Sequence, residues 1–295
     1  MITPGTAHAI DDLEFSARTI VESFRSGLHR SPFHGFAAEF SQHRSYRHGD
    51  DLKYLDWKIL ARTDRLYTRQ FSETTNLSVM LVVDASASMD FPRPPSGHVA
   101  SKFAFGVLVA AALAYLIIEQ GDAAGLITMA DDKFVYLPAR GGRSHRRALI
   151  AALSRLEPRG SWSLDRSLVR AGELLKRRGV VLAVSDFYDA TADTYRELRR
   201  IRRRGHDVSM LQVLSPEEIG FPFTGETRVE DLETHEVRHV DAGAAAAGYR
   251  AAVAEFLTGS RSQALRDGHD YFFLGTDVAP ERALRSYLLR RSAQS

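Results

Sequence analysis

Short apolar runs alternate with amphipathic segments along most of the chain, which is the pattern of strands that alternate with helices. Four runs are rich in Val, Leu and Phe: 77–84, 180–186, 207–214 and 270–275. The first is continuously apolar, as expected for a strand buried on both faces of a parallel sheet. Helical spacing of apolar residues occurs at about 99–120, 144–156, 164–178, 193–204, 244–266 and from Pro280 onward. Repeated strand and helix units of this length predict an α/β fold with a doubly wound, mostly parallel sheet and right-handed crossovers.

Two further runs, 122–130 and 133–139, meet at Asp131 and Asp132. Such a close pair of strands predicts a hairpin, so that one edge of the sheet is antiparallel. The resulting architecture is Rossmann-type, with the carboxyl ends of the parallel strands at one edge.

The order of the predicted elements divides the chain into two parts. Residues 10–28 have the spacing of an amphipathic helix, and a turn-rich break follows them. We assign residues 1–75 to an N-terminal helical and strand extension and residues 76–295 to the sheet domain. A hairpin insertion at about 216–241 precedes the last helix, strand and helix.

Residues 103–118 are sixteen residues without a charge, bounded by Lys102 and Glu119. A membrane span usually needs about 18 or more, and the many alanines fit a helix that is buried by protein on all sides. The N-terminal residues lack the basic leader and apolar core of a secretory signal, and the chain has no cysteine, which suits a reducing compartment. We therefore expect a cytoplasmic protein without a membrane span.

The net charge is only +2, from 39 basic and 37 acidic residues, so the whole molecule has no strong bias toward nucleic acid. Arginines nevertheless cluster locally, with six at 196–204 and four at 140–147. Tyr195, Leu198 and Ile201 give the first cluster one apolar stripe, so its arginines are most simply the solvated face of a helix. Binding of nucleic-acid phosphates by this helix is the alternative, although no motif that reads bases accompanies it.

One aspartate and two serines occupy alternate positions directly after the first strand of the sheet: Asp84, Ser86 and Ser88. Asp186 ends a second strand, and ligands of such sheets bind outside the carboxyl ends of the strands. Carboxylates and hydroxyls are hard oxygen donors that suit Mg²⁺, with Mn²⁺ or Ca²⁺ as alternatives. The competing interpretation is structural, since serines at these positions often bond backbone amides of a turn or helix start.

The string "DASASM" resembles the D-x-S-x-S metal-ion-dependent adhesion site of von Willebrand factor A domains, and Asp186 resembles the acidic residue that follows a later strand there. The resemblance also implies a threonine ligand from an intervening loop, where this chain has 159–168. Alignment places Trp162 at the threonine position, so Ser161 or Ser163 substitutes for it or that ligand is missing. The implied metal ligands are Asp84, Ser86, Ser88, Ser163 and Asp186.

A second informative block precedes the sheet domain. Leu52, Leu55 and Ile59 have helical spacing, with Asp50 or Asp51 as an N-cap. The following "RTDRLY" predicts a turn into a strand. The charged residues of the block either dock it onto the next domain through ion pairs or form a patch for a partner; they are Asp50, Asp51, Asp56, Lys58, Arg62 and Arg69.

The spaced pattern of this block is Y-x-x-G-D-D, then D-W-K, then A-R-T, immediately before the sheet domain. Over about residues 35–190 the chain resembles a bacterial family called domain of unknown function 58. Its members are commonly encoded beside MoxR-type AAA+ ATPases. The resemblance therefore implies such an ATPase as partner, in chaperone-like assembly or maturation of an unidentified client protein.

"HEVRH", residues 235–239, matches the zinc peptidase string H-E-x-x-H. That chemistry needs a helix, which brings the two histidines onto one face. The flanking residues favour two short strands around a polar turn, in which histidines four positions apart would lie about 13 Å apart. The alternative is a helix, with helical spacing of Val229, Leu232, Val237 and Val240.

The chain lacks the phosphate-binding, dinucleotide-binding and nucleophile-elbow motifs. We therefore expect no catalytic residues and no organic cofactor. The sequence predicts a non-catalytic, metal-dependent protein-protein interaction module that acts as an adaptor for a MoxR-type ATPase. A zinc peptidase and a nucleic-acid-binding protein are the two alternatives.

Overall fold

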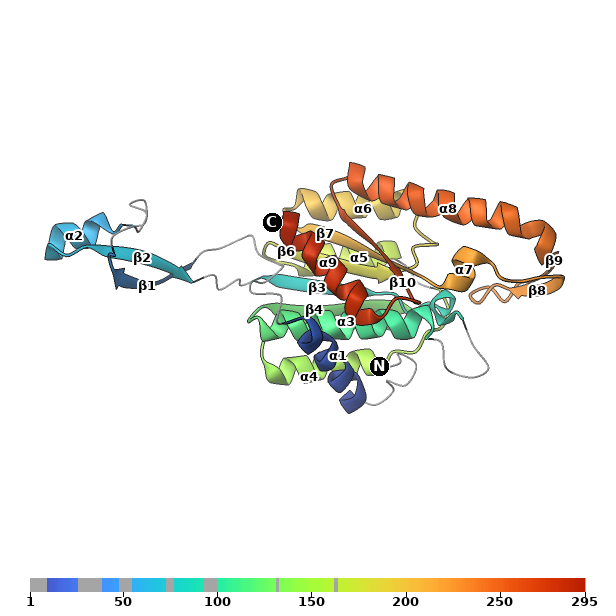
Figure 1. Ribbon diagram of the computed structural model, residues 1–295, viewed down its shortest axis with the longest axis horizontal. Coiled ribbons are helices and arrows are strands. Elements are labelled where there is room, and N and C mark those ends of the chain that lie inside the picture. Colours follow the sequence, from blue (N-terminus) through green and yellow to red (C-terminus); the bar gives the residue numbers. More distant parts are fainter. Residues whose placement is uncertain are drawn as a thin grey trace.

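The computed structural model describes residues 10–25, 39–47, 55–72, 77–92, 100–130, 133–161 and 164–294. At its centre is a six-stranded sheet with the strand order β10-β7-β6-β3-β4-β5 (Figure 1). All neighbouring strands are parallel except β4 and β5. The strands are β3 Ser78–Val83, β4 Ala123–Ala130, β5 Lys133–Arg140, β6 Gly179–Ser185, β7 Asp207–Leu214 and β10 Asp270–Gly275. The predicted doubly wound sheet with one antiparallel edge is confirmed.

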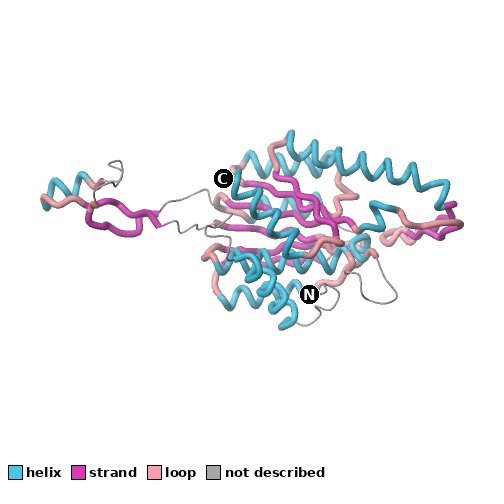
Figure 2. The backbone as a smooth tube through the Cα atoms, viewed as in Figure 1, coloured by secondary structure: helices cyan, strands magenta, loops and turns pink. Residues whose placement is uncertain are grey.

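Helices cover both faces of the sheet (Figure 2). One apolar core lies between the sheet and α1 Ile10–Arg25, α3 Lys102–Glu119, α4 Arg143–Ser154 and α9 Pro280–Gln294. A second core lies on the opposite face, under α5 Leu164–Leu174, α6 Ala192–Arg203 and α8 Ala242–Arg266. Because strands of the middle of the sheet contribute to both cores, their residues are apolar on both faces, which explains their continuous apolar sequences.

Helix α3 is the one helix in the described part of the chain that is long and apolar enough to cross a membrane by length and composition. In the fold, its residues from Phe105 to Ile118 are all buried. The alanines of α3, which include Ala110, Ala111 and Ala114, are fully shielded and allow α1 and α4 to pack closely against it. The structure thus places this segment inside the protein core, as its composition indicates.

Helix α1 buries Leu13, Ala17, Ile20 and Val21 in the same core as α3. It also packs against α4 and α9. The division predicted from the sequence assigns this helix to the N-terminal extension, residues 1–75. In the structure, α1 instead packs in a helical layer of the sheet domain. An amphipathic helix with a single apolar face needs such a surface to bury that face.

The rest of the extension is a small unit of two antiparallel strands and one helix: β1 Glu39–Ser45, α2 Trp57–Thr63 and β2 Tyr67–Ser72. Asp56 caps α2 by accepting hydrogen bonds from the backbone N–H groups of Lys58 and Ile59, at 3.0 and 3.2 Å. Asp64 ends the helix in a left-handed conformation, which confirms the predicted turn into a strand.

The start of α2 differs from the prediction. Leu55 forms an isolated β-bridge with Thr68 instead of lying in the helix, and Asp56 is the N-cap. The predicted caps Asp50 and Asp51 lie outside the described residues. In Figure 1 this unit stands away from the sheet domain, so its described residues give no support to the docking interpretation.

A hairpin lies within the predicted insertion at about 216–241. It consists of β8 Glu226–Glu230 and β9 Val237–Asp241, and it follows the short helix α7 Pro216–Gly220. Side chains of both strands are mostly exposed. The hairpin therefore adds little to the core and is an appendage at one end of the sheet (Figure 1).

Gly179 begins β6 at a point where the two central strands approach closely. A Cβ at this position would lie 2.2 Å from the backbone oxygen of Ser78 in β3. We expect Gly179→Ala to displace the strands and to lower the free energy of unfolding by about 1–3 kcal/mol or more, measured by urea unfolding. Gly248→Ala is the control, because its Cβ would meet no atom within 4 Å and alanine favours the helix. Equal effects of the two substitutions would contradict this packing.

Candidate metal centre

Asp84 and Asp186 lie directly after two adjacent parallel strands, β3 and β6. The backbone N–H of Asp84 donates a hydrogen bond to the Val184 oxygen at 2.9 Å, which extends the pairing of the two strands. Both aspartates are buried, each with 2% of its surface exposed. The structure therefore brings together the two carboxylates that the sequence places at the ends of separate strands.

The loop after β3 arranges Asp84 and the two serines around one point. The Asp84 carboxylate accepts hydrogen bonds from the Ser86 backbone N–H at 2.8 Å and from the Ser185 hydroxyl at 2.6 Å. The Ser86 and Ser88 hydroxyl oxygens are 2.8 Å apart. Ser86 is the N-cap of the short 3-10 helix η3 Ala87–Asp90, but its side chain makes no capping bond. The Ser86 hydroxyl therefore does not cap η3, whereas its backbone N–H takes part in the turn through Asp84.

Burial of Asp84 makes its charge costly. Burial, followed by the charge of Asp186, raises the pKa of Asp84 from 3.8 to about 7, although bonds from Ser185 and Ser86 lower it. Two buried carboxylates at the ends of adjacent strands repel each other because little water screens them. A cation at this point would relieve that repulsion.

Lys102 supplies part of the missing positive charge. Its ammonium Nζ lies 2.7 Å from Asp186 Oδ2 and 2.6 Å from Glu218 Oε1, and only 1% of its side chain is exposed. Burial alone would lower the pKa of Lys102, but the charges of Asp186 and Glu218 more than offset this and raise it. Lys102 thus stays charged in the interior.

Glu218 is held in place by its own helix. Its Oε2 accepts the Ser215 backbone N–H at 2.8 Å, and the Ser215 hydroxyl accepts the Glu218 N–H, which forms a capping box at the start of α7. The Tyr188 ring covers the Lys102 ammonium, 4.9 Å from its centroid. Lys102 and Glu218 are not among the site residues that the sequence predicts, although "SPEE" carries the signal for the capping box.

The loop after α4 lies beside the Asp84 loop, as the resemblance implies. The Arg159 N–H donates to the Ala85 oxygen at 3.0 Å, and the Ala87 N–H donates to the Gly160 oxygen at 2.9 Å. Ser161 is exposed at the end of this loop. Trp162 and the predicted ligand Ser163 lie outside the described residues.

The residues present fit a hard cation. Asp84, Asp186 and Glu218 are all buried, and Lys102 contacts Asp186 and Glu218. These three carboxylates and one ammonium carry a formal charge of −2 when all are ionised. Within the described ranges, no three His, Cys, Asp or Glu side chains converge to hold an ion by themselves. The ligands would therefore include the Ser86 and Ser88 hydroxyls and water, a set that suits Mg²⁺.

The H-E-x-x-H string does not form a helix. His235 lies in the turn between β8 and β9 with a φ of 60°, and His239 lies in β9. Both are exposed. The predicted strands around a polar turn are confirmed, and the geometry that a zinc peptidase requires is absent from these described residues.

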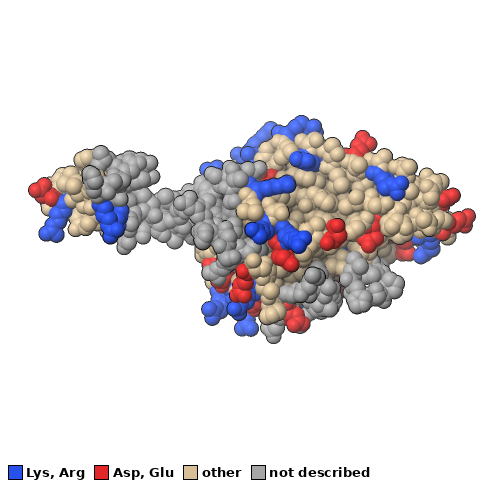
Figure 3. Space-filling view, viewed as in Figure 1, with Lys and Arg blue, Asp and Glu red and all other residues tan. Residues whose placement is uncertain are grey.

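The arginine-rich helix α6 pairs three of its arginines, Arg196, Arg199 and Arg200, with nearby acids. Ion pairs join Arg196 to Asp193 at 2.8 Å and Arg199 to Asp267 at 2.9 Å. Figure 3 shows basic side chains along the upper edge of the molecule, where α6 and one end of α8 lie, and side chains of both signs at the hairpin end. Phosphate binding by α6 would compete with these pairs.

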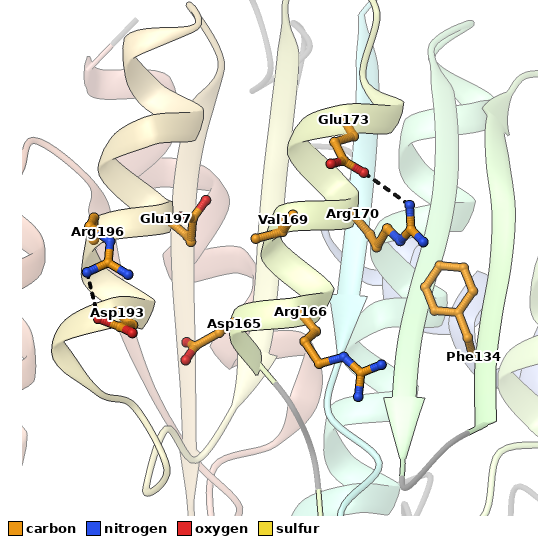
Figure 4. A pocket seen from close by; sticks show the side chains of 9 residues that line it. All are labelled: Phe134, Asp165, Arg166, Val169, Arg170, Glu173, Asp193, Arg196 and Glu197. Carbon is orange, nitrogen blue, oxygen red and sulfur yellow. Dashed lines mark hydrogen bonds and ion pairs between the residues drawn. The ribbon is translucent and has the colours of Figure 1, made fainter.

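A pocket of about 660 Å³ lies between α5 and α6 (Figure 4). Its lining mixes both signs of charge, and Arg170 pairs with Glu173 at 3.1 Å. None of the predicted metal ligands lines it. The pocket is lined by side chains of both charge signs from two helices, and it is separate from the buried carboxylates.

A family model described as "Protein of unknown function DUF58" matches residues 42–262. Uncharacterised proteins of Mycobacterium bovis and Mycobacterium tuberculosis are each 30% identical to this chain over 269 residues. The matches cover 87% of this chain and 82% of each relative. Because the matches leave only 13% of this chain uncovered, they include part of the extension as well as the sheet domain.

Solved structures resemble the chain in fold. An aerotolerance-related membrane protein from Bacteroides fragilis is 14% identical, with a TM-score of 0.50, and the match covers 74% of this chain and 100% of that one. A von Willebrand factor type A structure from Catenulispora acidiphila is 14% identical, with a TM-score of 0.42, over 77% of this chain and 43% of that one. The first of these matches, at a TM-score of 0.50, supports the doubly wound α/β fold that the sequence predicts.

The raised pKa of Asp84 has a measurable effect on stability. In protein kept free of divalent cations, Asp84 retains its proton in the fold up to about pH 7 but releases it near 3.8 when unfolded. Its contribution to the free energy of unfolding is therefore largest below pH 3.8 and declines as the pH rises to about 7. Urea unfolding between pH 4 and 8 should show this decline in the wild type and a flatter profile in Asp84→Asn. Identical slopes in the two proteins would show that Asp84 is not the titrating group.

The Lys102 pairs predict a large cost for removing one cation. Lys102→Met leaves Asp186 and Glu218 buried without their partner, which should lower the free energy of unfolding by about 3–5 kcal/mol. The double variant with Glu218→Gln should recover part of this loss. Exposed Lys176 is the control, since Lys176→Met should change stability by less than about 0.5 kcal/mol. If Lys102→Met lowered the free energy of unfolding by no more than Lys176→Met does, the Lys102 ion pairs would not be buried.

Proposed function

This chain belongs to the DUF58 family, and from its candidate metal centre we propose that it is a non-catalytic protein-protein interaction module. It binds a divalent cation, Mg²⁺ in the first instance, with Mn²⁺ or Ca²⁺ as alternatives. Asp84, Ser86, Ser88 and Asp186 hold the ion, with Ser163 or Ser161 as a further ligand. The ion then binds an acidic side chain of a partner.

The observation that carries this proposal is the loop after β3, in which the Ser86 and Ser88 hydroxyls lie 2.8 Å apart next to the buried Asp84. The buried Asp186 follows the adjacent parallel strand β6. Few of the ligands carry charge, so a bound dication keeps part of its positive charge and attracts an anionic group. The sequence carries none of the phosphate-binding or nucleophile-elbow motifs, so we propose binding rather than catalysis as the activity of this site.

We further propose a MoxR-type AAA+ ATPase as the partner. The signature block and the sheet domain together resemble a family whose members are encoded beside such ATPases. In this role the protein would be a cytoplasmic adaptor that brings an unidentified client to the ATPase for assembly or maturation.

Mg²⁺ should stabilise the wild type. A ligand at ten times its dissociation constant adds about 1.4 kcal/mol to the free energy of unfolding, which thermal unfolding can detect. Asp84→Ala and the double variant Ser86→Ala with Ser88→Ala should lose this response. Asp193→Ala is the matched control, because Asp193 is an exposed acid at the start of α6 and should leave the response intact.

The partner is tested with the immobilised protein and a purified MoxR-type ATPase from the same organism, with Mg²⁺ and with chelator. The wild type and Asp193→Ala should retain the ATPase only when Mg²⁺ is present, and Asp84→Ala should not retain it. Retention that is independent of both Mg²⁺ and Asp84 would place the binding surface elsewhere and reject the proposed role of the ion.

A further inference from the structure

The turn of the β8–β9 hairpin points back toward the candidate metal centre. Figure 1 shows the hairpin at the end of the sheet where β3 leads into η3. Asp231 braces the turn, because its carboxylate accepts the N–H groups of Glu233 and Thr234 at 2.8 and 2.9 Å. The His235 N–H also donates to the Asp231 oxygen at 2.9 Å. The turn is thus ordered and presents Glu233 in one defined place.

Glu233 is the residue of this turn that faces the metal centre. Its Oε1 atom is shielded from solvent and has no hydrogen-bond partner among the described residues. Burial and then the charge of Asp189 raise the pKa of Glu233, whereas the hydroxyls of Ser88 and Ser86 lower it. The carboxylate therefore lies close to the same two hydroxyls that would bind the ion.

The turn also faces the loop that follows β6. Burial raises the pKa of Asp189, and the charges of Asp186 and Asp231 raise it further. Glu233 and Asp231 of the hairpin thus approach the carboxylates of Asp186 and Asp189. Lys102 contacts Asp186, and the other carboxylates repel one another unless a proton or a further cation lies among them.

The hairpin is not held at this place by an apolar core. Val229 and Val237 are 43% and 39% exposed, and the hairpin's backbone bonds run mainly between its own strands. A polar contact at the turn is therefore a major part of what holds it over the site, and such a contact can be exchanged for another of the same chemistry.

We propose that Glu233 is an intramolecular ligand of the bound cation. Its carboxylate occupies the coordination position that a partner's carboxylate takes. The hairpin is then closed over the ion in the resting protein, and a partner binds by displacing Glu233. This inference rests on the proposed metal-dependent binding and adds a competing group within the same chain. The apparent affinity for a partner is then the intrinsic affinity multiplied by the fraction of molecules in which the hairpin is open.

The first test uses the metal alone. Glu233→Gln keeps the size of the side chain but removes its charge, and titration calorimetry with Mg²⁺ should show about tenfold weaker binding, the order of loss expected for a metal-site partner. Glu236→Gln in the same turn is the matched control, because Glu236 is exposed and pairs with Arg238. Its Mg²⁺ affinity should equal that of the wild type. Equal affinities for all three proteins would overturn the inference.

The second test follows the hairpin directly. Hydrogen exchange of the backbone amides of 226–241 should slow when Mg²⁺ is added to the wild type or to Glu236→Gln, but not when it is added to Glu233→Gln. Exchange that does not respond to Mg²⁺ in the wild type would also overturn the inference.

Failure of this inference differs from failure of the proposed function. If Asp84→Asn abolishes Mg²⁺ binding while Glu233→Gln changes neither the affinity nor the exchange, the ion binds without the hairpin and only this inference is wrong. If the wild type binds no Mg²⁺, both are wrong. An acidic partner should bind Glu233→Gln more tightly than it binds the wild type at saturating Mg²⁺, because the competing carboxylate is gone.

Discussion

The repulsion between buried carboxylates at the ends of β3 and β6 is the constraint on which the site depends. Asp84 and Asp186 end adjacent strands and are shielded from water, so their charges must be balanced by nearby groups. Lys102 balances part of the charge by contacting Asp186 and Glu218. The negative charge that Lys102 does not balance is neutralised either by a proton on Asp84 or by a divalent cation. The group that sets the stability of the fold is therefore the same group that would bind the ion in the proposed function.

The fold brings these groups together through ordinary packing. Helix α3 is buried along nearly its whole length, and its first residue, Lys102, is therefore carried into the interior at the strand ends. Helix α7 fixes Glu218 by a capping box, and the backbone of the loop at Gly160 bonds the turn after Asp84. The hairpin is different because its strands are exposed and its turn is polar. It is the part of this region that can move without disturbing a core.

Most of the fold could be predicted from the sequence, because strands that are apolar on both faces must be covered by helices on both sides of the sheet. Asp84 and Asp186 could be predicted as neighbours since each follows such a strand. Lys102 could not, because a charge beside an apolar segment ordinarily marks its solvent-exposed end, and only the tertiary position of α3 shows that it is buried. Leu55 has helical spacing, yet it pairs with Thr68 because Asp56 is the residue that caps α2. The approach of Glu233 depends on the path of a hairpin, which local patterns do not encode.

The most direct test of the central claim is to locate the ion. Crystals of the protein grown with Mn²⁺ and measured with anomalous X-ray scattering would show its position without any assumption about partners. We expect a single strong peak between the hydroxyls of Ser86 and Ser88 and the Asp84 carboxylate. Crystals with no peak there, in which the Asp84 loop keeps the hydrogen bonds described above, would show that Lys102 and a proton on Asp84 balance the charge and that the site is structural.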